Sequence, residues 1–157
     1  MRNQKGFSLI ELLLVVAVIL IVSAIAVPNF MRSRMRANEA NAVAGMRVIH
    51  TSAVTYATTY PDVGFPAQLI NMGGVNPCAA TSTSSCLIDN VLALGVKDGY
   101  SYVWTGDGLT PSVGFALTAT PQVIGSSGQR MFCTDQAGTV YYDPTGSGCT
   151  NASQPID

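Results

Sequence analysis

The sequence predicts an α+β fold, in which one long N-terminal helix packs on a C-terminal antiparallel meander of three to four strands. Two observations predict this architecture. An apolar run near the start continues into a helical pattern that lasts to residue 60. Runs of β-prone residues separated by turn signals follow only after residue 99. A chain of 157 residues has room for one small domain beside such a helix.

The apolar run occupies residues 7–27, and between Leu12 and Val27 only Ser23 is polar. A helix rises about 1.5 Å per residue, so a run of this length is sufficient to cross a bilayer. We therefore expect a membrane-spanning helix at 7–27, preceded by a leader at 1–6 that takes no part in the fold. Basic residues flank both ends of the run, so charge alone does not orient it. These are Arg2 and Lys5 before it and Arg32, Arg34 and Arg36 after it.

Glu11 is the one charge inside this run. A carboxylate at the centre of a membrane helix costs about 2.5–3.5 kcal/mol on insertion scales. One interpretation is that Glu11, four residues from Phe7, reaches the lipid headgroups. The other is that it meets a positive partner. If the chain were cut after Gly6, Phe7 would carry a new α-amine, and two helices offset by about one turn could pair Glu11 with that amine.

Residues 28–60 predict a continuation of the same helix outside the membrane. Pro28 lacks an N–H, so we expect it to kink or loosen the helix. Apolar residues then recur at three- and four-residue steps, which is typical of one buried helix face. They are Ala42, Met46, Ile49, Ala53, Tyr56 and Tyr60. Pro61 ends the helix. A helix this long exceeds a small domain, so we expect its other half to pack against further copies of the chain.

Beyond the helix, residues 61–99 predict a long connection, residues 100–143 the sheet and residues 144–157 a polar tail. The strands are expected at 100–105, 113–120, 130–134 and 139–143. The last two flank a hairpin connection in which Gly138 is available for positive φ. The apolar face of the sheet should cover the helical stripe.

Four cysteines, all beyond the membrane run, predict two disulfides in an exported domain. They are Cys78, Cys86, Cys133 and Cys149. A bridge between Cys78 and Cys86 would pin the loop between them. Counting alone leaves the crossed pairings open.

The Gly-Phe-Ser-Leu-Ile-Glu stretch at 6–11, the apolar run, and Ala-Val-Pro-Asn-Phe at 26–30 resemble the N-terminus of type IV prepilins and of type II secretion pseudopilins. The resemblance implies that a prepilin peptidase cuts between Gly6 and Phe7 on the cytoplasmic face and that Phe7 becomes N-methylated. It implies that Glu11 neutralises the N-terminus of a neighbouring subunit, with Phe7, Glu11 and Pro28 as assembly residues. Segments of the expected sheet also resemble type IVa pilins, in which a bridge corresponding to Cys133–Cys149 closes the C-terminal loop.

The function that this resemblance implies is that of a structural subunit, without enzymatic activity or cofactor. The precursor would span the cytoplasmic membrane once with its N-terminus inside, and would then polymerise into a helical surface filament for adhesion, twitching motility or DNA uptake. The partners would be further copies of the chain, the lipid bilayer and an inner-membrane assembly platform. An external ATPase would be needed, because the sequence has no G-x-x-x-x-G-K-[ST] phosphate loop. No basic tract indicates nucleic acid as the main partner.

The remaining chemistry indicates no catalytic or metal site. His50 is the only histidine, and we interpret it as an ordinary helix residue. The acidic residues at 89–98, 107 and 135–143 do not match a calcium loop, so we interpret them as turn formers.

Two alternatives stay open. A type II secretion pseudopilin would share the N-terminal motif, and a C-terminal calcium site would favour it, whereas the disulfide-pinned loop and tail favour a surface pilin. A secreted soluble domain would require cleavage after Ala26, at the small-residue sequence Ala24-Ile25-Ala26. Against that alternative, Glu11 interrupts the apolar region and the helical pattern continues past Pro28.

Overall fold

The computed structural model describes residues 6–75 and 77–156, so the expected leader lies outside the described residues except for Gly6. The helical elements are α1 (Leu9–Thr59), the 3-10 helix η1 (Leu69–Met72) and α2 (Asn90–Ala93). The strands are β1 (Val96–Lys97), β2 (Tyr100–Gly106), β3 (Phe115–Pro121), β4 (Met131–Asp135), β5 (Tyr141–Asp143) and β6 (Gln154–Pro155). The chain separates into two compact units, Met1–Arg34 and Met35–Asp157, and α1 is one continuous helix that contributes to both.

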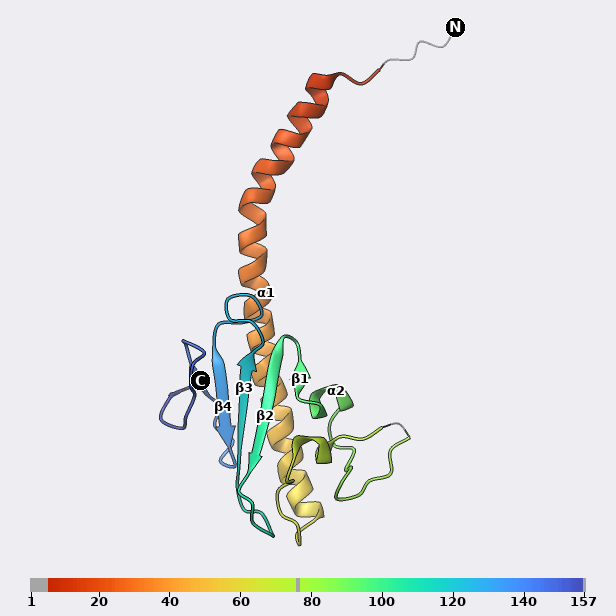
Figure 1. Cartoon of the computed structure of the whole chain (residues 1–157), viewed down its shortest axis with the longest axis vertical. Helices are drawn as coiled ribbons and strands as arrows, with labels where there is room; N and C mark the ends of the chain where they lie inside the picture. The colour runs from red at the N-terminus through yellow and green to blue at the C-terminus, as the bar shows by residue number, and fades with distance from the viewer. Residues whose placement is uncertain (1–5, 76, 157) are drawn as a thin grey trace. The chain divides into compact units, whose positions relative to one another are not determined.

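The six strands form one sheet in chain order, β1 to β6, and each neighbouring pair is antiparallel (Figure 1). The α+β class and the antiparallel meander are therefore confirmed, but the meander is longer than the three to four strands expected. The sheet extends from Val96 to Pro155, beyond the expected range of 100–143 at both ends.

The two strands that the sequence does not predict are β1 and β6. Each has only two residues, too few to produce an alternating pattern. Asp98 and Gly99 join β1 to β2, both with positive φ (51° and 77°), which matches a two-residue Asp-Gly hairpin turn. Pro155 lies in the outermost strand, where a missing N–H does not interrupt a central ladder.

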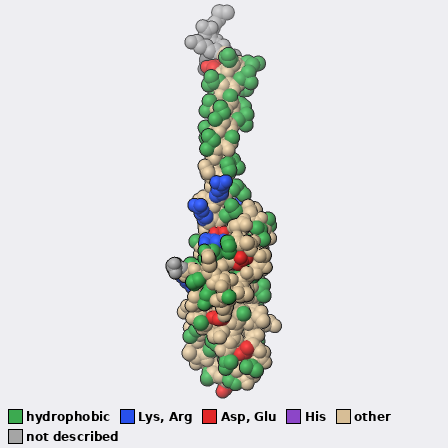
Figure 2. Space-filling model, turned by 90° about the vertical axis from the view of Figure 1, so that its left-hand side faces the viewer, with side chains coloured by type: hydrophobic (Ala, Val, Ile, Leu, Met, Phe, Trp, Pro, Cys, Tyr) green, Lys and Arg blue, Asp and Glu red, His purple; other side chains and the backbone are tan. Residues whose placement is uncertain are grey.

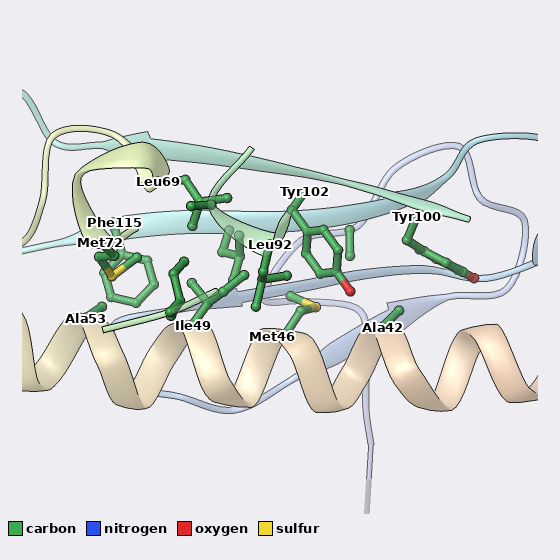
Figure 3. Packing of buried hydrophobic residues seen from close by; sticks show 14 of the residues in the cluster. Ala42, Met46, Ile49, Ala53, Leu69, Met72, Leu92, Tyr100, Tyr102 and Phe115 are labelled. Carbon is green, nitrogen blue, oxygen red and sulfur yellow. The ribbon is translucent and has the colours of Figure 1, made fainter. Parts of the chain in front are cut away.

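The second unit has its core between α1 and the sheet (Figure 3). Five members of the predicted helical stripe are buried, since Ala42, Met46, Ile49 and Ala53 are fully buried and Tyr56 is 1% exposed. The sixth, Tyr60, follows the end of α1 at Thr59 and is half-buried against the core. The sheet contributes inward-facing residues from β2, β3 and β4: Tyr100, Tyr102, Phe115, Leu117, Ala119 and Phe132. Strand β3 alternates between buried and more exposed positions, as expected for a sheet with one face on the core.

The connection between helix and sheet folds back over the same core. Met72 in η1 and Leu92 in α2 are buried in it. The Met72 carbonyl accepts hydrogen bonds from the N–H groups of Leu87 and Ile88. These bonds join the residues that precede and follow the loop between them. The described residues on both sides of this connection therefore pack as part of the domain.

Candidate assembly site

The start of α1 carries the residues that the sequence analysis selected for processing and assembly. Gly6, Phe7 and Ser8 precede the helix, and the Phe7 side chain is 82% exposed. The N–H of Ser8 donates to Oε2 of Glu11 at 3.2 Å. Ser8 is the residue before the helix and Glu11 is its third residue, so this bond is one half of a capping box. Glu11 also lies in the first turn, where a negative charge is favourable beside the exposed N–H groups.

The first half of α1 is apolar on all sides and is not buried by the rest of the described chain. Its leucines, isoleucines and valines between Leu9 and Val27 are 46–75% exposed. By length and composition this part of α1 could cross a membrane. Figure 2 shows hydrophobic side chains over the visible face of this segment. A helix that is apolar all round requires lipid or other helices to cover it.

Pro28 lies inside α1, and the segment from Leu20 to Pro28 is helical. Because proline has no N–H, it donates no intrahelical bond to the carbonyl of Ala24. The helix is therefore weakened at this point by covalent structure alone.

The arginines that follow the apolar run are solvent-exposed. Arg32, Arg34, Arg36 and Arg47 all lie on exposed positions of α1. Among the described residues the ion pairs are instead Arg130–Glu39 and Lys97–Asp89. The exposed arginines are thus available for headgroups, solvent or other chains.

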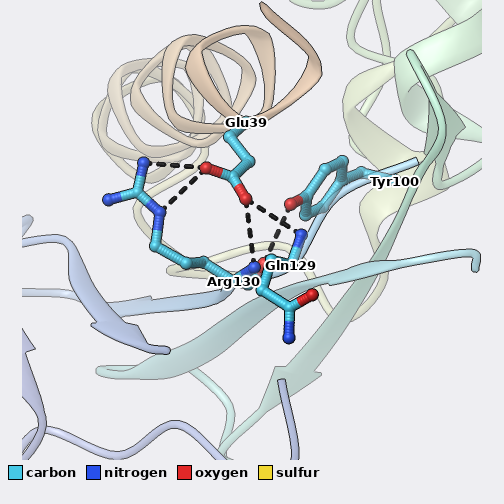
Figure 4. A network of polar contacts seen from close by, with 4 residues as sticks. All are labelled: Glu39, Tyr100, Gln129 and Arg130. Carbon is cyan, nitrogen blue, oxygen red and sulfur yellow. Dashed lines mark hydrogen bonds and ion pairs between the residues drawn. The ribbon is translucent and has the colours of Figure 1, made fainter. Parts of the chain in front are cut away.

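Glu39 joins the helix to the sheet, a role that the sequence analysis missed (Figure 4). Its side chain is 7% exposed. One carboxylate oxygen accepts the backbone N–H groups of Gln129 (2.9 Å) and Arg130 (3.2 Å), and the other accepts Nε and Nη2 of Arg130 (2.9 and 2.8 Å). The Tyr100 hydroxyl donates to the Arg130 carbonyl at 2.8 Å. Four donors on one carboxylate fix this part of α1 against the segment that enters β4.

We refer to the contact of Glu39 with Gln129 and Arg130 as the helix-to-sheet clamp. The pKa shifts of Glu39 and Tyr100 follow from the contacts around it. Burial by itself raises the pKa of Glu39, but the amides of Gln129 and Arg130 and the Arg130 guanidinium outweigh it and leave the pKa lowered. Burial also raises the pKa of Tyr100, and the Glu39 charge raises it further. The cluster therefore holds an ionised Glu39 and a neutral Tyr100 at neutral pH. Glu39 is the only acidic residue in 28–60 and lies three residues before Ala42 on the apolar stripe, which is the signal that could have identified it.

Disulfides join Cys78 to Cys86 and Cys133 to Cys149, with Cα–Cα distances of 6.2 and 5.7 Å. The first closes the loop that precedes α2. The second ties the segment after β5 to β4. The crossed pairings that counting left open do not occur in this structure.

His50, Asp89 and Asp143 make contacts within the fold. His50 packs near Phe115, and its Nε2 lies 3.3 Å from the Gln136 carbonyl. Asp89 caps α2 by accepting the Leu92 N–H at 2.9 Å. The Thr145 hydroxyl and the Ser147 amide lower the pKa of Asp143 to about 2. Within 6–75 and 77–156, no three His, Cys, Asp or Glu side chains are grouped to hold a metal ion.

Comparison with known proteins agrees with the resemblance of the N-terminal sequence to type IV prepilins. The family model for the prokaryotic N-terminal methylation motif matches residues 1–27. The type IV wide pilus major component PilA4 of Thermus thermophilus is 56% identical over 39 residues, which are 25% of this chain and 30% of that protein. The type IV major pilin protein PilA of Myxococcus xanthus is 31% identical over 101 residues, 60% of this chain and 45% of that protein.

A fimbrial protein of Pseudomonas aeruginosa is similar over a larger share of its own length. It is 33% identical over 113 residues, which cover 63% of this chain and 73% of that protein. The chain belongs to the type IV pilin family. The match to this pilin spans less than half the length of the Thermus and Myxococcus relatives. No solved structure matches it. For this pilin, the exposed apolar half of α1 and the start of the helix form the candidate assembly site.

Proposed function

We propose that this chain is the structural subunit of a type IV pilus, cut between Gly6 and Phe7 by a prepilin peptidase and methylated on the new N-terminus. Membership of the pilin family and the matched methylation motif support the proposal. The precursor is anchored by the first half of α1, with its N-terminus in the cytoplasm and its sheet domain outside. After cleavage it moves from lipid into a helical surface filament that serves adhesion, twitching motility or DNA uptake.

The observation that carries this proposal is the unburied apolar half of α1, in which Glu11 is the only charge. In lipid this surface is already covered, so the hydrophobic effect does not by itself drive the helices together. Close packing and polar pairing must supply the difference, together with energy from an external ATPase at an inner-membrane assembly platform. The sequence offers one intramembrane pair, between the Glu11 carboxylate and the amine that cleavage creates on Phe7 of a neighbouring copy.

Cleavage changes the surroundings of Glu11 as well as those of Phe7. In the uncut chain Glu11 accepts the Ser8 N–H, so the carboxylate already has one partner. In the filament the remaining carboxylate oxygen accepts the α-amine of the neighbour, while the Ser8 bond keeps the side chain oriented. Capping and intersubunit pairing are thus compatible uses of one carboxylate.

The test replaces Glu11 and measures two quantities. In Glu11→Ala, the amount of chain in the cell membrane should stay unchanged, because the apolar run remains. Surface filaments recovered by shearing should fall more than about tenfold, because removal of one partner of a buried charge pair costs roughly 3–5 kcal/mol. Ser23→Ala, a polar-to-alanine change elsewhere in the run, is the matched control. Abundant, normal filaments from Glu11→Ala would overturn the role of this residue.

A type II secretion pseudopilin is distinguished by location. It would show the same processed N-terminus but would be found only in the cell envelope, never in the sheared fraction. The disulfide-closed loop at Cys78–Cys86 and the closed C-terminal segment at Cys133–Cys149 favour the surface filament, which must withstand shear.

A further inference from the structure

Two exposed arginines follow the apolar run of α1 on opposite sides of the helix. Arg32 and Arg34 are two positions apart, and a helix turns about 100° per residue, so their side chains leave it in nearly opposite directions. Arg34 shares its side with Phe30, four residues before it, which is 67% exposed. Figure 2 shows basic side chains directly after the hydrophobic part of the helix. We refer to Arg32 and Arg34 as the basic pair.

Within the described residues the basic pair has no acidic partner. The ion pairs there are Arg130–Glu39 and Lys97–Asp89. No acidic residue occurs in the sequence between Glu11 and Glu39. Glu11 lies at the other end of the apolar run, and both carboxylate oxygens of Glu39 already accept hydrogen bonds in the helix-to-sheet clamp. The two guanidinium groups can therefore receive an anion from outside the chain.

The spacing along α1 matches the layers of a bilayer. The hydrocarbon core is about 30 Å thick, and the headgroup layers add about 5–8 Å on each side. Because α1 is continuous, Arg32 begins about 7 Å beyond Val27, and helical side chains lean back toward the N-terminus. From Glu11 to Arg32 the helix rises about 32 Å, close to the thickness of the core. When the helix crosses a bilayer upright, these two charges lie at opposite edges of the hydrocarbon.

Arginine at this depth is suited to a lipid phosphate. The planar guanidinium group can bind two oxygens of one phosphate at once, and its methylene stem can lie along apolar surface. In the topology that we propose, this end of the helix lies on the side away from the cytoplasm, where the positive-inside bias disfavours arginine. A bound phosphate offsets that unfavourable placement.

We propose that the basic pair binds the phosphates of anionic lipids in the leaflet that faces away from the cytoplasm. Since the two arginines leave opposite sides of the helix, each takes its own headgroup, and Phe30 lies against the acyl boundary below one of them. The contact fixes the depth of the helix, with Glu11 at the cytoplasmic edge of the hydrocarbon. This inference rests on the proposed function, because it assumes an anchored subunit with its sheet domain outside.

Lipid retention by the full chain tests this contact. The chain is reconstituted in vesicles of phosphatidylcholine and phosphatidylglycerol and released in mild detergent, and the retained lipids are quantified by mass spectrometry. We expect phosphatidylglycerol to be enriched over its share in the vesicles. That enrichment should fall about fivefold for each arginine changed in Arg32→Gln and Arg34→Gln, given the usual attraction of one arginine to an anionic surface. Arg47→Gln, at an exposed position farther along α1, is the matched control.

A second comparison separates a lipid from a free anion. Sodium phosphate added to the solubilised protein should lower the enrichment no more than sodium chloride at the same ionic strength, because salt acts only by screening. Displacement by phosphate but not by chloride would overturn the assignment to a lipid.

The remaining outcomes separate this inference from the proposed function. Unchanged enrichment in the double variant, or an equal fall in Arg47→Gln, would overturn the lipid contact. If the double variant keeps its enrichment but forms no filaments, the arginines serve a contact between subunits instead, and the proposal fails. If the double variant does not insert, Arg34→Gln alone decides, since an unchanged ratio there would overturn the contact. Absence of filaments from the unmodified chain would count against the proposed function and not against lipid binding.

Discussion

The two halves of α1 use apolar side chains in opposite ways. In the first half, the large aliphatic residues from Leu9 to Val27 are 46–75% exposed and surround the helix. In the second half, the buried apolar residues form one stripe, on which Met46 and Ile49 are fully buried under the sheet, while Val48 and Val54 lie on exposed positions. One stretch of helix therefore stabilises its own domain, and the other has surface to bury in lipid or against further chains. The residues of α1 that stabilise the domain are therefore separate from those that we propose for assembly.

The largest expected effect comes from equivalent truncations in the two halves. Ile49→Ala should lower the free energy of unfolding of the sheet domain by about 2–5 kcal/mol, because it leaves a cavity in the core. Leu13→Ala, at a position 59% exposed, should leave that free energy unchanged. Urea unfolding in detergent micelles measures both, with fluorescence of the only tryptophan, Trp104, as the probe. Trp104 reports on the sheet domain, because its indole N–H donates to the Pro66 carbonyl at 2.8 Å. Equal losses of unfolding free energy in Ile49→Ala and Leu13→Ala would show that the two halves of α1 do not differ in their contribution to domain stability.

Removal of the disulfides should lower the unfolding free energy of the sheet domain without changing membrane insertion. Cys133→Ser with Cys149→Ser opens a loop with a sequence separation of 16, and Cys78→Ser with Cys86→Ser one with a separation of 8. Chain-entropy estimates give losses of about 3 and about 2.5 kcal/mol in unfolding free energy. The same urea titration ranks the two variants. Membrane insertion, measured by fractionation, should be unaffected in both, and a defect there would show that the halves are not independent.

The helix-to-sheet clamp predicts a smaller effect. Glu39→Gln removes the charge that binds Arg130, and we expect a loss of about 1.5–3 kcal/mol, typical of hydrogen bonds to charged groups. Asp89→Asn is the matched control, since it removes the exposed pair with Lys97 but keeps an N-cap residue on α2. That change should cost less than about 1 kcal/mol. Similar losses of unfolding free energy from Glu39→Gln and Asp89→Asn would mean that the buried pair of Glu39 and Arg130 stabilises the fold no more than the exposed pair of Asp89 and Lys97.

The smallest expected effect is on pH dependence. The pKa of Glu39 is lowered from its ordinary value of 4.5 in the folded chain. The unfolded chain therefore binds the proton more readily, and this part of the stability is complete above the ordinary pKa and is lost as the pH falls through the lowered one. Wild type should lose more unfolding free energy than Glu39→Gln between neutral pH and about pH 3. Parallel losses in the two proteins, measured by urea midpoints, would assign the acid sensitivity to other carboxylates.

Much of this fold could be predicted because its signals are local. The spacing of Ala42, Met46 and Ile49 is visible in the sequence, and that stripe is the buried face of the helix. The four longer strands lie close to their expected positions, and Gly138 has the positive φ (80°) for which it was available. The N-terminal motif is equally local, since Gly6, Phe7 and Glu11 lie within six residues.

The features that could not be predicted depend on contacts between distant residues. Glu39 and Arg130 are separated by 91 positions, and nothing near either residue reveals the other. Strands β1 and β6 exist because a neighbouring strand offers unpaired backbone groups, not because their own two residues favour a strand. Long-range pairing of this kind emerges only when the sheet is assembled.

We propose that the first half of α1 is retained for assembly after the chain is cut between Gly6 and Phe7. The most direct measurement is the intact mass and N-terminal sequence of protein sheared from the cell surface. We expect a chain that begins at methylated Phe7 and lacks four cysteine hydrogens, because two disulfides remove them. A chain that begins at Val27 would contradict it, because the apolar half and Glu11 would then be absent from the mature protein.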